Sequence, residues 1–213
     1  VIVAGAAGIS SGIGVMKGII DSAPDISKID VTPTGYSTTV LAANGEETAT
    51  LVGQGANRQY VTIDEIPLDL QHAFVAIEDE RFYDHNGIDL HGIGRAFISG
   101  LSKGRFSEGA STITQQLIKN NVLTSWTSET SFVEKLQRKI QEQYLALELE
   151  KQVNDKDWIL ENYMNSVNLG ANTLGVQAAS KKYFNKDVSE LTLSEASVIA
   201  GITQNPSGYN PIT

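Results

Sequence analysis

The 213-residue chain contains no cysteine, only two methionines and only three histidines. Without cysteine it can have no disulfide framework, no thiolate metal site and no cysteine nucleophile. The histidines, His72, His85 and His91, do not stand at the helical spacing of metal ligands, so no metal site is predicted. Positive charge is scarce as well, since the net charge is −9. Nucleic acid is therefore not an expected partner, because its binding needs a cationic surface.

The rest of the composition is that of a folded protein, with 41% apolar and 19% charged residues. The length suits one large domain, or one domain with a small appendage. Charge is unevenly distributed, because residues 95–151 hold eight Lys or Arg against six Glu. This stretch is net positive within an acidic chain, so we expect any anionic ligand to bind there.

Residues 1–20 differ from the rest of the chain, because they are rich in Val, Ile, Ala and Gly and carry Lys17 as their single charge. A membrane-spanning helix needs about twenty mainly apolar residues. A soluble glycine-rich segment is the alternative, but we interpret residues 1–20 as part of a transmembrane anchor. They lack the basic start and the cleavage site of a signal peptide.

Two Thr- and Val-rich runs flank Asn44-Gly45, which is typical of a tight β-hairpin, and residues 58–63 could add a third strand. Thr62, Thr112 and Thr192 are each followed three residues later by Glu or Gln, which predicts three capping boxes. We predict an anchor over residues 1–20, a linker and small β element over 21–65, and a mainly α domain over 66–213.

Apolar periodicity marks the helices of this domain. One face of the first helix carries Leu70, Ala73, Phe74 and Ile77. A long helix further on has an apolar stripe of Val133, Leu136, Ile140, Tyr144 and Leu147. Residues 158–167 and 176–184 give two more helices, and a last one follows Thr192.

Glu78 and Asp79 directly follow the apolar face of the first predicted helix. A carboxylate at a helix end beside an open turn is well placed to act as a general base. The neighbouring Phe74, Phe82 and Tyr83 would shield it from water. The alternative is a solvated charged run, which is the commoner outcome when spacing alone is considered.

A small polar run from Gly109 to Gln116 opens another helix, with Lys119 one turn further on. Its unpaired backbone amides could bind phosphate, although an ordinary Ser/Thr cap is the common alternative. A second feature is the stripe of Lys135, Arg138, Lys139 and Glu142 on the long helix. This stripe is either a solvated face with i,i+4 ion pairs or a cationic wall facing a diphosphate, and periodicity leaves both open.

Together these segments resemble glycosyltransferase family 51, the polymerase domain of class A penicillin-binding proteins and of monofunctional glycosyltransferases. Five blocks match in order, within residues 66–211: residues 78–87, 109–120, 138–142, 159–165 with 175–179, and 193–211. The segment between Asn120 and Arg138 is longer than the resemblance leads us to expect, and we expect it to be mobile.

The resemblance implies a mainly α fold, with a lysozyme-like helical lobe, a smaller mobile lobe near the membrane and a short N-terminal β element. It implies that lipid II is polymerised into β-1,4-linked glycan strands by inverting transfer, with release of undecaprenyl diphosphate. Glu78 takes the place of the general base, and Glu142 that of the second catalytic carboxylate, near the diphosphate. The substrate contacts that it implies are Asp79, Phe82, His85, Arg95, Ser111, Thr112, Gln115, Gln116, Lys119, Arg138 and Lys139.

The resemblance implies no required cofactor, although Mg or Mn could bind near the diphosphate. The expected partners are lipid II, the growing glycan chain, the cytoplasmic membrane, a downstream transpeptidase domain and divisome or elongation proteins. A single-pass anchor would hold the catalytic domain on the extracytoplasmic face of the cell membrane. No Ser-x-x-Lys motif occurs, so a penicillin-reactive serine domain does not lie within these residues.

Two other classes of protein remain as alternatives. One is a lysozyme-like hydrolase or lytic transglycosylase acting on peptidoglycan, which would not need the second Glu or the cationic stripe. The other is a non-enzymatic, membrane-tethered binding module, which loss of Glu78 or Glu142 would favour. Both carboxylates are present.

Overall fold

The computed structural model describes residues 13–28, 30–51, 57–103 and 111–212. Residues 13–21 are helical and precede the labelled elements. These elements are η1 (Ile26–Lys28), β1 (Thr38–Leu41), β2 (Glu47–Leu51), η2 (Ile63–Glu65), α2 (Leu68–Glu78), α3 (Leu90–Lys103), α4 (Ile113–Asn121), η3 (Thr124–Ser128), α5 (Phe132–Val153), α6 (Lys156–Ser166), α7 (Val176–Phe184), η4 (Val188–Glu190) and α8 (Leu193–Ile202). The prediction of a mainly α fold is confirmed.

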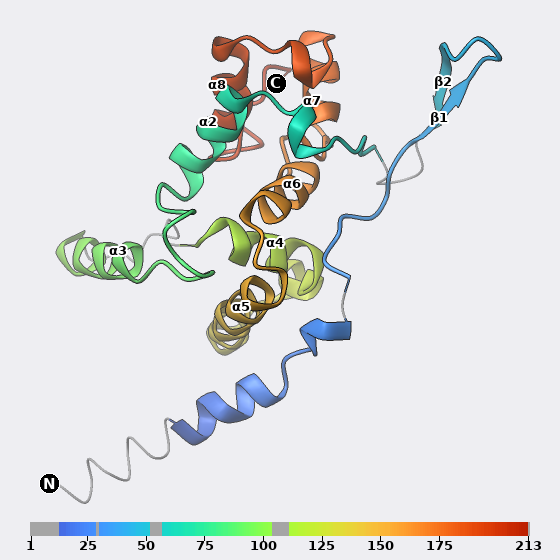
Figure 1. Cartoon of the computed structure of the whole chain (residues 1–213). Helices are drawn as coiled ribbons and strands as arrows, with labels where there is room; N and C mark the ends of the chain where they lie inside the picture. Colours follow the sequence, from blue (N-terminus) through green and yellow to red (C-terminus); the bar gives the residue numbers. More distant parts are fainter. Residues whose placement is uncertain (1–12, 29, 52–56, 104–110, 213) are drawn as a thin grey trace, which may run out of the picture.

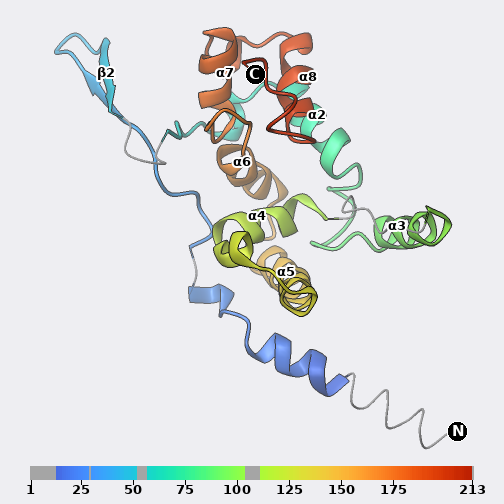
Figure 2. The same ribbon diagram turned by 180° about the vertical axis from the view of Figure 1, so that it is seen from behind.

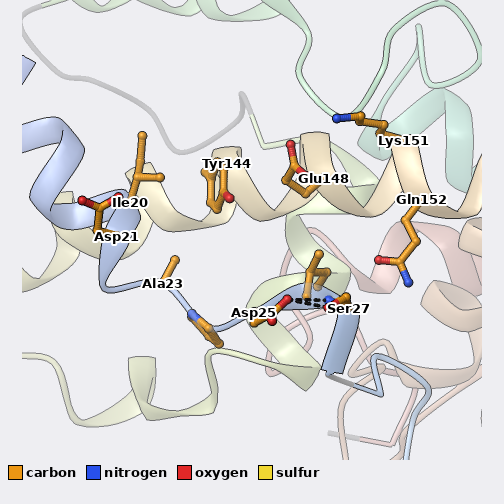
Figure 3. A pocket seen from close by; sticks show the side chains of 11 residues that line it. Ile20, Asp21, Ala23, Asp25, Ser27, Tyr144, Glu148, Lys151 and Gln152 are labelled. Atoms are coloured by element: carbon orange, nitrogen blue, oxygen red, sulfur yellow. Dashed lines mark hydrogen bonds between the residues drawn. The ribbon is translucent and has the colours of Figure 1, made fainter.

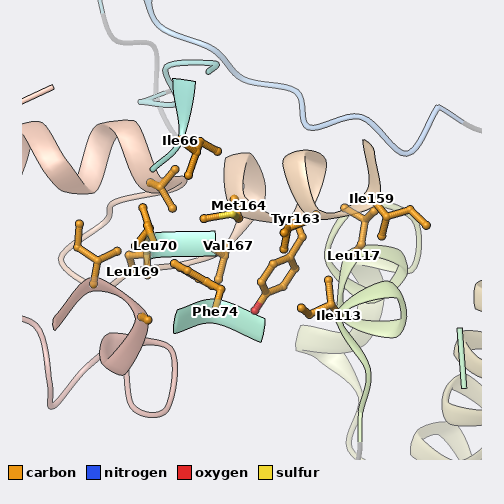
Figure 4. Packing of buried hydrophobic residues seen from close by; sticks show 14 of the residues in the cluster. Ile66, Leu70, Phe74, Ile113, Leu117, Ile159, Tyr163, Met164, Val167 and Leu169 are labelled. Atoms are coloured by element: carbon orange, nitrogen blue, oxygen red, sulfur yellow. The ribbon is translucent and has the colours of Figure 1, made fainter. Parts of the chain in front are cut away.

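The hydrophobic core joins the helices that carry the matched sequence blocks. In Figure 1, α2 lies along α8, while α4 packs against both α5 and α6. Fully buried Leu70 and Phe74 of α2 meet Tyr163 and Met164 of α6 (Figure 4). Each large apolar side chain that is buried stabilises the fold by roughly 1.5–3 kcal/mol. This core therefore fixes the C-terminal end of α2, where Glu78 stands, against α4 and α6.

The small β element is the predicted hairpin. Strands β1 and β2 are antiparallel, with Val40 opposite Ala49. Gly45 has φ 84°, a left-handed conformation that suits glycine in a tight turn. Figures 1 and 2 both show the hairpin projecting away from the helical body.

The third strand predicted over residues 58–63 is wrong, because among residues 57–63 Arg58 forms only an isolated bridge with Tyr36. The backbone of Val61 instead bonds to the side chain of Asn165, which donates to its carbonyl at 2.8 Å and accepts from its amide at 3.0 Å. An amide side chain of α6 thus replaces the neighbouring strand that a ladder would need.

Capping boxes form at two of the three predicted positions. Thr62 with Glu65 and Thr192 with Glu195 form reciprocal boxes, although the first opens the short η2 rather than an α-helix.

The box predicted at Thr112 is wrong in one half. Thr112 accepts from the backbone amide of Gln115, but the Gln115 side chain is bonded elsewhere, to Gly87 and Lys139.

The buried face of α5 differs from the predicted apolar stripe. Val133, Leu136 and Leu147 are 69%, 49% and 42% exposed. The buried positions are instead Gln141, Glu142, Leu145, Ala146, Leu149 and Glu150. The predicted stripe is therefore wrong as the core face of α5. The buried face of this helix carries Gln141, Glu142 and Glu150, and buried polar side chains of this kind are typical of a functional site.

The N-terminal segment lies along α5 (Figure 3). Gln141 Nε2 donates to the carbonyl of Ile19 at 3.3 Å and to Ser22 Oγ at 3.1 Å. A cavity of about 450 Å³ lies between residues 20–27 and the second half of α5. Residues 1–12 of the predicted anchor lie outside the described residues. None of the helices within the described ranges is long and apolar enough to cross a membrane.

Candidate active site

A polar cavity of about 510 Å³ lies where α2, α4, α5 and the turn after α8 meet. Its lining residues are Ile77, Glu78, Ser111, Gln116, Lys119, Trp126, Arg138, Lys139, Glu142, Thr203 and Gln204. The structure thus brings together two carboxylates and three cations that are far apart in the sequence. Among the residues predicted for the site, those that line this cavity are Glu78, Ser111, Gln116, Lys119, Arg138, Lys139 and Glu142.

Glu78 is the last residue of α2 and is half-buried. Gln116 Nε2 of α4 donates to its Oε2 at 2.7 Å, and Gln204 Nε2 donates to its Oε1 at 3.0 Å. Hydrogen bonds from neutral amides orient a carboxylate without neutralising it with a cation. This carboxylate is therefore oriented and still able to accept a proton from a ligand.

Glu142 lies inside a network of cations on α5 and is almost fully buried. Arg138 Nη1 donates to its Oε1, and Lys139 Nζ donates to its Oε2 at 2.9 Å. Lys139 Nζ also donates to Ser111 Oγ at 2.6 Å and to Gln115 Oε1 at 3.1 Å. A buried carboxylate needs such partners. Glu142 in turn fixes both cations at the cavity wall.

Arg138 is held from a second side by Glu129, in the segment between η3 and α5. Arg138 Nε lies 2.9 Å from both carboxylate oxygens of Glu129. Burial alone would lower the pKa of Arg138, but its bonds to Glu129 and Glu142 outweigh burial and raise that pKa. The guanidinium therefore stays charged and has a fixed orientation.

Lys119 stands in the last turn of α4, where the helix dipole favours a cation. Its Nζ lies 4.9 Å from the ring centroid of Trp126 in η3. This distance is within the range of a cation–π interaction. The segment between Asn120 and Arg138 thus contributes an aromatic wall to the cavity.

Asp79, next to Glu78, bonds to residues of the first two matched sequence blocks and so joins residues 78–87 to residues 109–120. His85 Nε2 lies 3.0 Å from both of its oxygens, and the backbone amide of Ile113 donates to Oδ2 at 3.0 Å. Thr112 Oγ1 donates to the carbonyl of Gly87 at 2.8 Å. These bonds fix the loop after α2 to the start of α4, so Asp79, His85 and Thr112 shape the site.

Gly87 occupies a position that only glycine fits. Its φ is +87°, and an added Cβ would lie 2.6 Å from the carbonyl oxygen of Ala146 in α5. The loop can therefore approach α5 closely, and this approach places the Gly87 carbonyl within reach of Thr112 and Gln115.

Six of the residues expected to contact substrate do not line this cavity: Asp79, Phe82, His85, Arg95, Thr112 and Gln115. Phe82 is fully buried, and Lys156 Nζ lies 4.4 Å from its ring centroid. Arg95 is 66% exposed on α3, with Nη1 3.9 Å from Glu80. Arg95 borders a smaller neighbouring cavity of about 120 Å³ that it shares with Ser111.

Several residues of the site are absent from the set predicted from sequence. Gln204 and Tyr163 lie within matched blocks, but the match does not predict their contacts. Gln204 donates to Glu78, and Tyr163 donates to Gln116, which itself holds Glu78. Glu129 had no motif to mark it. Trp126 lies in the segment between Asn120 and Arg138, which the sequence marks only by its length.

A carboxylate facing fixed cations in one cavity defines a class of enzyme. Such an enzyme removes a proton from a nucleophile and stabilises negative charge on a departing group. The comparisons with known proteins agree with this class.

The model of the transglycosylase family matches residues 44–213. Penicillin-binding protein 1A of Clostridium botulinum (strain Langeland) is 50% identical over 161 residues, which are 73% of this chain and 18% of that protein. Penicillin-binding protein 1F of Bacillus subtilis is 44% identical over 176 residues, 83% of this chain and 23% of that protein. Penicillin-binding protein 1A/1B of Bacillus subtilis is 38% identical over 206 residues, 96% of this chain and 21% of that protein.

The chain belongs to the transglycosylase family. The predicted resemblance to the glycosyltransferase domain of class A penicillin-binding proteins is thereby confirmed. The chain spans about a fifth of the length of these curated relatives.

Proposed function

We propose that this domain polymerises lipid II into β-1,4-linked glycan strands, with inversion and release of undecaprenyl diphosphate. One observation carries the proposal: a single cavity holds Glu78 from α2 together with Arg138, Lys139 and Glu142 from α5. Membership of the transglycosylase family supports the same reaction class. The activity is proposed for a domain within a longer protein.

Glu78 is the general base of the proposed reaction. Its carboxylate accepts the proton of the 4-hydroxyl of the acceptor sugar. The oxygen of that hydroxyl then bonds to the anomeric carbon of the growing chain. The bond between this carbon and the diphosphate oxygen breaks, and the diphosphate leaves with the electron pair. A positioned general base typically contributes a factor of about 10²–10⁴ in rate.

The cations of α4 and α5 stabilise the departing diphosphate. Lys139 and Arg138 are already fixed by Glu142, so no reorganisation is needed when negative charge develops. Charge-assisted bonds to phosphate are stronger than neutral ones, and the Arg guanidinium can offer two parallel donors. Glu142 acts by holding these donors in place.

A divalent cation, Mg or Mn, belongs in this proposal only as an assistant at the diphosphate. The two oxygens of Glu142 accept from Arg138 and Lys139, so two cations already offset the charge of this carboxylate. Within the described ranges, no group of three or more His, Asp or Glu side chains could hold a metal ion. The proposal therefore places such a cation on the diphosphate itself. Chelation with EDTA before the assay tests whether turnover depends on it.

We also propose a location and partners for the whole protein. Residues 1–20 would be part of a single-pass anchor in the cell membrane, with the domain on the extracytoplasmic face. The growing glycan chain, the cytoplasmic membrane and divisome or elongation proteins are the proposed partners. A transpeptidase domain would follow the glycosyltransferase domain in the longer protein.

A lysozyme-like hydrolase or lytic transglycosylase is the alternative activity. A glycosidase needs a protonated carboxyl to help a sugar oxygen leave. The cavity instead offers fixed cations, which suit a diphosphate leaving group. This contrast favours synthesis over cleavage.

Substitution of the base tests the proposal. Glu78→Gln should lower lipid II polymerisation by about 10²–10⁴ while binding of a diphosphate lipid stays within about threefold. Glu80→Gln is the matched control, since Glu80 is exposed two residues away. Turnover is measured by gel analysis of glycan products. Near-normal turnover by Glu78→Gln would refute the role of Glu78 as the general base.

A further inference from the structure

The two oxygens of Glu78 are held by two glutamine amides that differ in their exposure to solvent. Gln116 of α4 holds Oε2 and is half-buried, whereas Gln204 holds Oε1 and is exposed. An exposed amide can exchange its place with water or with the hydroxyl of a ligand. The half-buried Gln116 amide has a second partner that holds it in place, so the environments of the two oxygens differ.

Tyr163 is the second partner of Gln116. Its hydroxyl donates to Gln116 Oε1 at 3.3 Å, a long hydrogen bond. Its ring is completely buried between Phe74 and Ile113 (Figure 4), and the Phe74 ring meets it edge to face at 6.1 Å. A ring packed in this way places its hydroxyl at one fixed point near the end of α2.

The Tyr163 hydroxyl stays protonated. Burial raises its pKa well above the ordinary value, and the nearby charges of Glu78 and Asp79 raise it further. It therefore acts as a donor toward Gln116. If the Gln116 amide turned over, its carbonyl would face the Glu78 carboxylate, an unfavourable contact between two acceptors, and the Tyr163 hydroxyl would have to accept instead of donate.

We propose that Tyr163 is a positioning residue for the general base, acting through Gln116, and that Oε1 of Glu78 is the oxygen that takes the proton. This inference rests on the proposed function. Gln116 stays on Oε2 throughout the reaction. Gln204 gives up its place at Oε1 to the acceptor hydroxyl, whose proton moves to Oε1 as its oxygen attacks the anomeric carbon.

Removing the Tyr163 hydroxyl tests whether its hydrogen bond to Gln116 positions the base. Tyr163→Phe keeps the ring and its packing and should lower kcat about tenfold, with KM for lipid II within about twofold of the wild type. Tyr183→Phe is the matched control, because Tyr183 donates to the carbonyl of Leu169 at 2.6 Å, outside the residues of the cavity. That control should leave kcat unchanged.

A double-mutant cycle separates positioning from general stability. In a Gln116→Ala background, Tyr163→Phe should lower kcat by less than about twofold, because its effect passes through the Gln116 amide. A tenfold loss that persists in this background would overturn the role of Tyr163, since a merely structural effect would add independently.

Truncation of the two amides tests which oxygen takes the proton, and it does not depend on how well Tyr163→Phe folds. Gln116→Ala should lower kcat about tenfold or more, whereas Gln204→Ala should lower it by less than about threefold. Equal losses, or a larger loss for Gln204→Ala, would overturn the assignment of Oε1. Absence of polymerisation by the wild type would refute the proposed function instead, so the two failures are distinguishable.

Discussion

At the scale of single residues, the charges on the α5 wall of the cavity are paired before any substrate arrives. Glu142 is buried between Arg138 and Lys139, and Glu129 holds Arg138 from its other side. An unpaired charge in such a place would cost several kcal/mol, so the pairs stabilise each other. Pairing leaves the donors pre-oriented toward the cavity, which is the property that stabilisation of a leaving anion requires.

The residues Lys139 and Lys135 give a matched prediction, because both are lysines on α5 one turn apart. Lys139 lines the cavity and bonds to Glu142, whereas Lys135 is exposed and does not line it. Lys139→Ala should weaken binding of a diphosphate lipid about tenfold or more, and Lys135→Ala should change it by less than about twofold. Titration of each variant with that lipid measures this. Equal effects would mean that the stripe is only a charged surface.

At the scale of elements, the start of α8 is stabilised by a carboxylate whose charge matters. Hydrogen bonds from Lys186, and then from the Thr192 backbone amide, lower the pKa of Glu195 to about 2. The folded-state pKa lies below the unfolded value of about 4.3. The stabilisation by Glu195 is therefore present above about pH 4 and is lost as the pH falls toward 2.

Glu195→Gln should accordingly lower the melting temperature at pH 7, because the charged partner of Lys186 is lost. The difference between the variant and the wild type should shrink as the pH falls from 4 toward about 2. Thermal unfolding followed by circular dichroism across this range measures both curves. A difference that stays constant down to pH 2 would show that the charge of Glu195 does not stabilise α8.

Elements with strong local signals were predictable, and those fixed by distant side chains were not. The predicted helix over 176–184 coincides with α7 (Val176–Phe184), because Gly175 precedes its apolar face and Asn185 ends it with φ 52°. The extra strand at Arg58 failed because Asn165, more than a hundred residues away, satisfies the backbone of Val61. Periodicity failed on α5, where the buried face includes Gln141, Glu142 and Glu150.

At the scale of the whole molecule, the site is assembled from matched blocks far apart in the chain. The resemblance gave Glu78, Lys119, Arg138, Lys139 and Glu142, and the cavity contains all of them. The contacts that orient these residues could not be predicted, because a partner such as Gln204 lies 126 residues from Glu78. Only the packing of α2 along α8 brings the two together.

The N-terminal segment gives a prediction for the whole chain. If residues 1–20 belong to an anchor, the 213-residue chain should require detergent, or bind to lipid vesicles. Deleting residues 1–20 should abolish vesicle binding and lower polymerisation on bilayers, while binding of a soluble diphosphate ligand stays intact. Vesicle sedimentation of the two forms measures this. A 213-residue chain that stays monomeric without detergent would refute the anchor.

The central claim is that the domain builds glycan strands by using Glu78 as a base and fixed cations for the diphosphate. Incubating the purified protein with lipid II and, in parallel, with purified cell-wall sacculi tests it most directly. The account predicts glycan polymer on the gel from lipid II and no soluble muropeptides from sacculi, because neither Glu78 nor Glu142 is placed to protonate a leaving sugar oxygen. Robust muropeptide release with no polymer formed would contradict it and identify a lysozyme-like hydrolase instead.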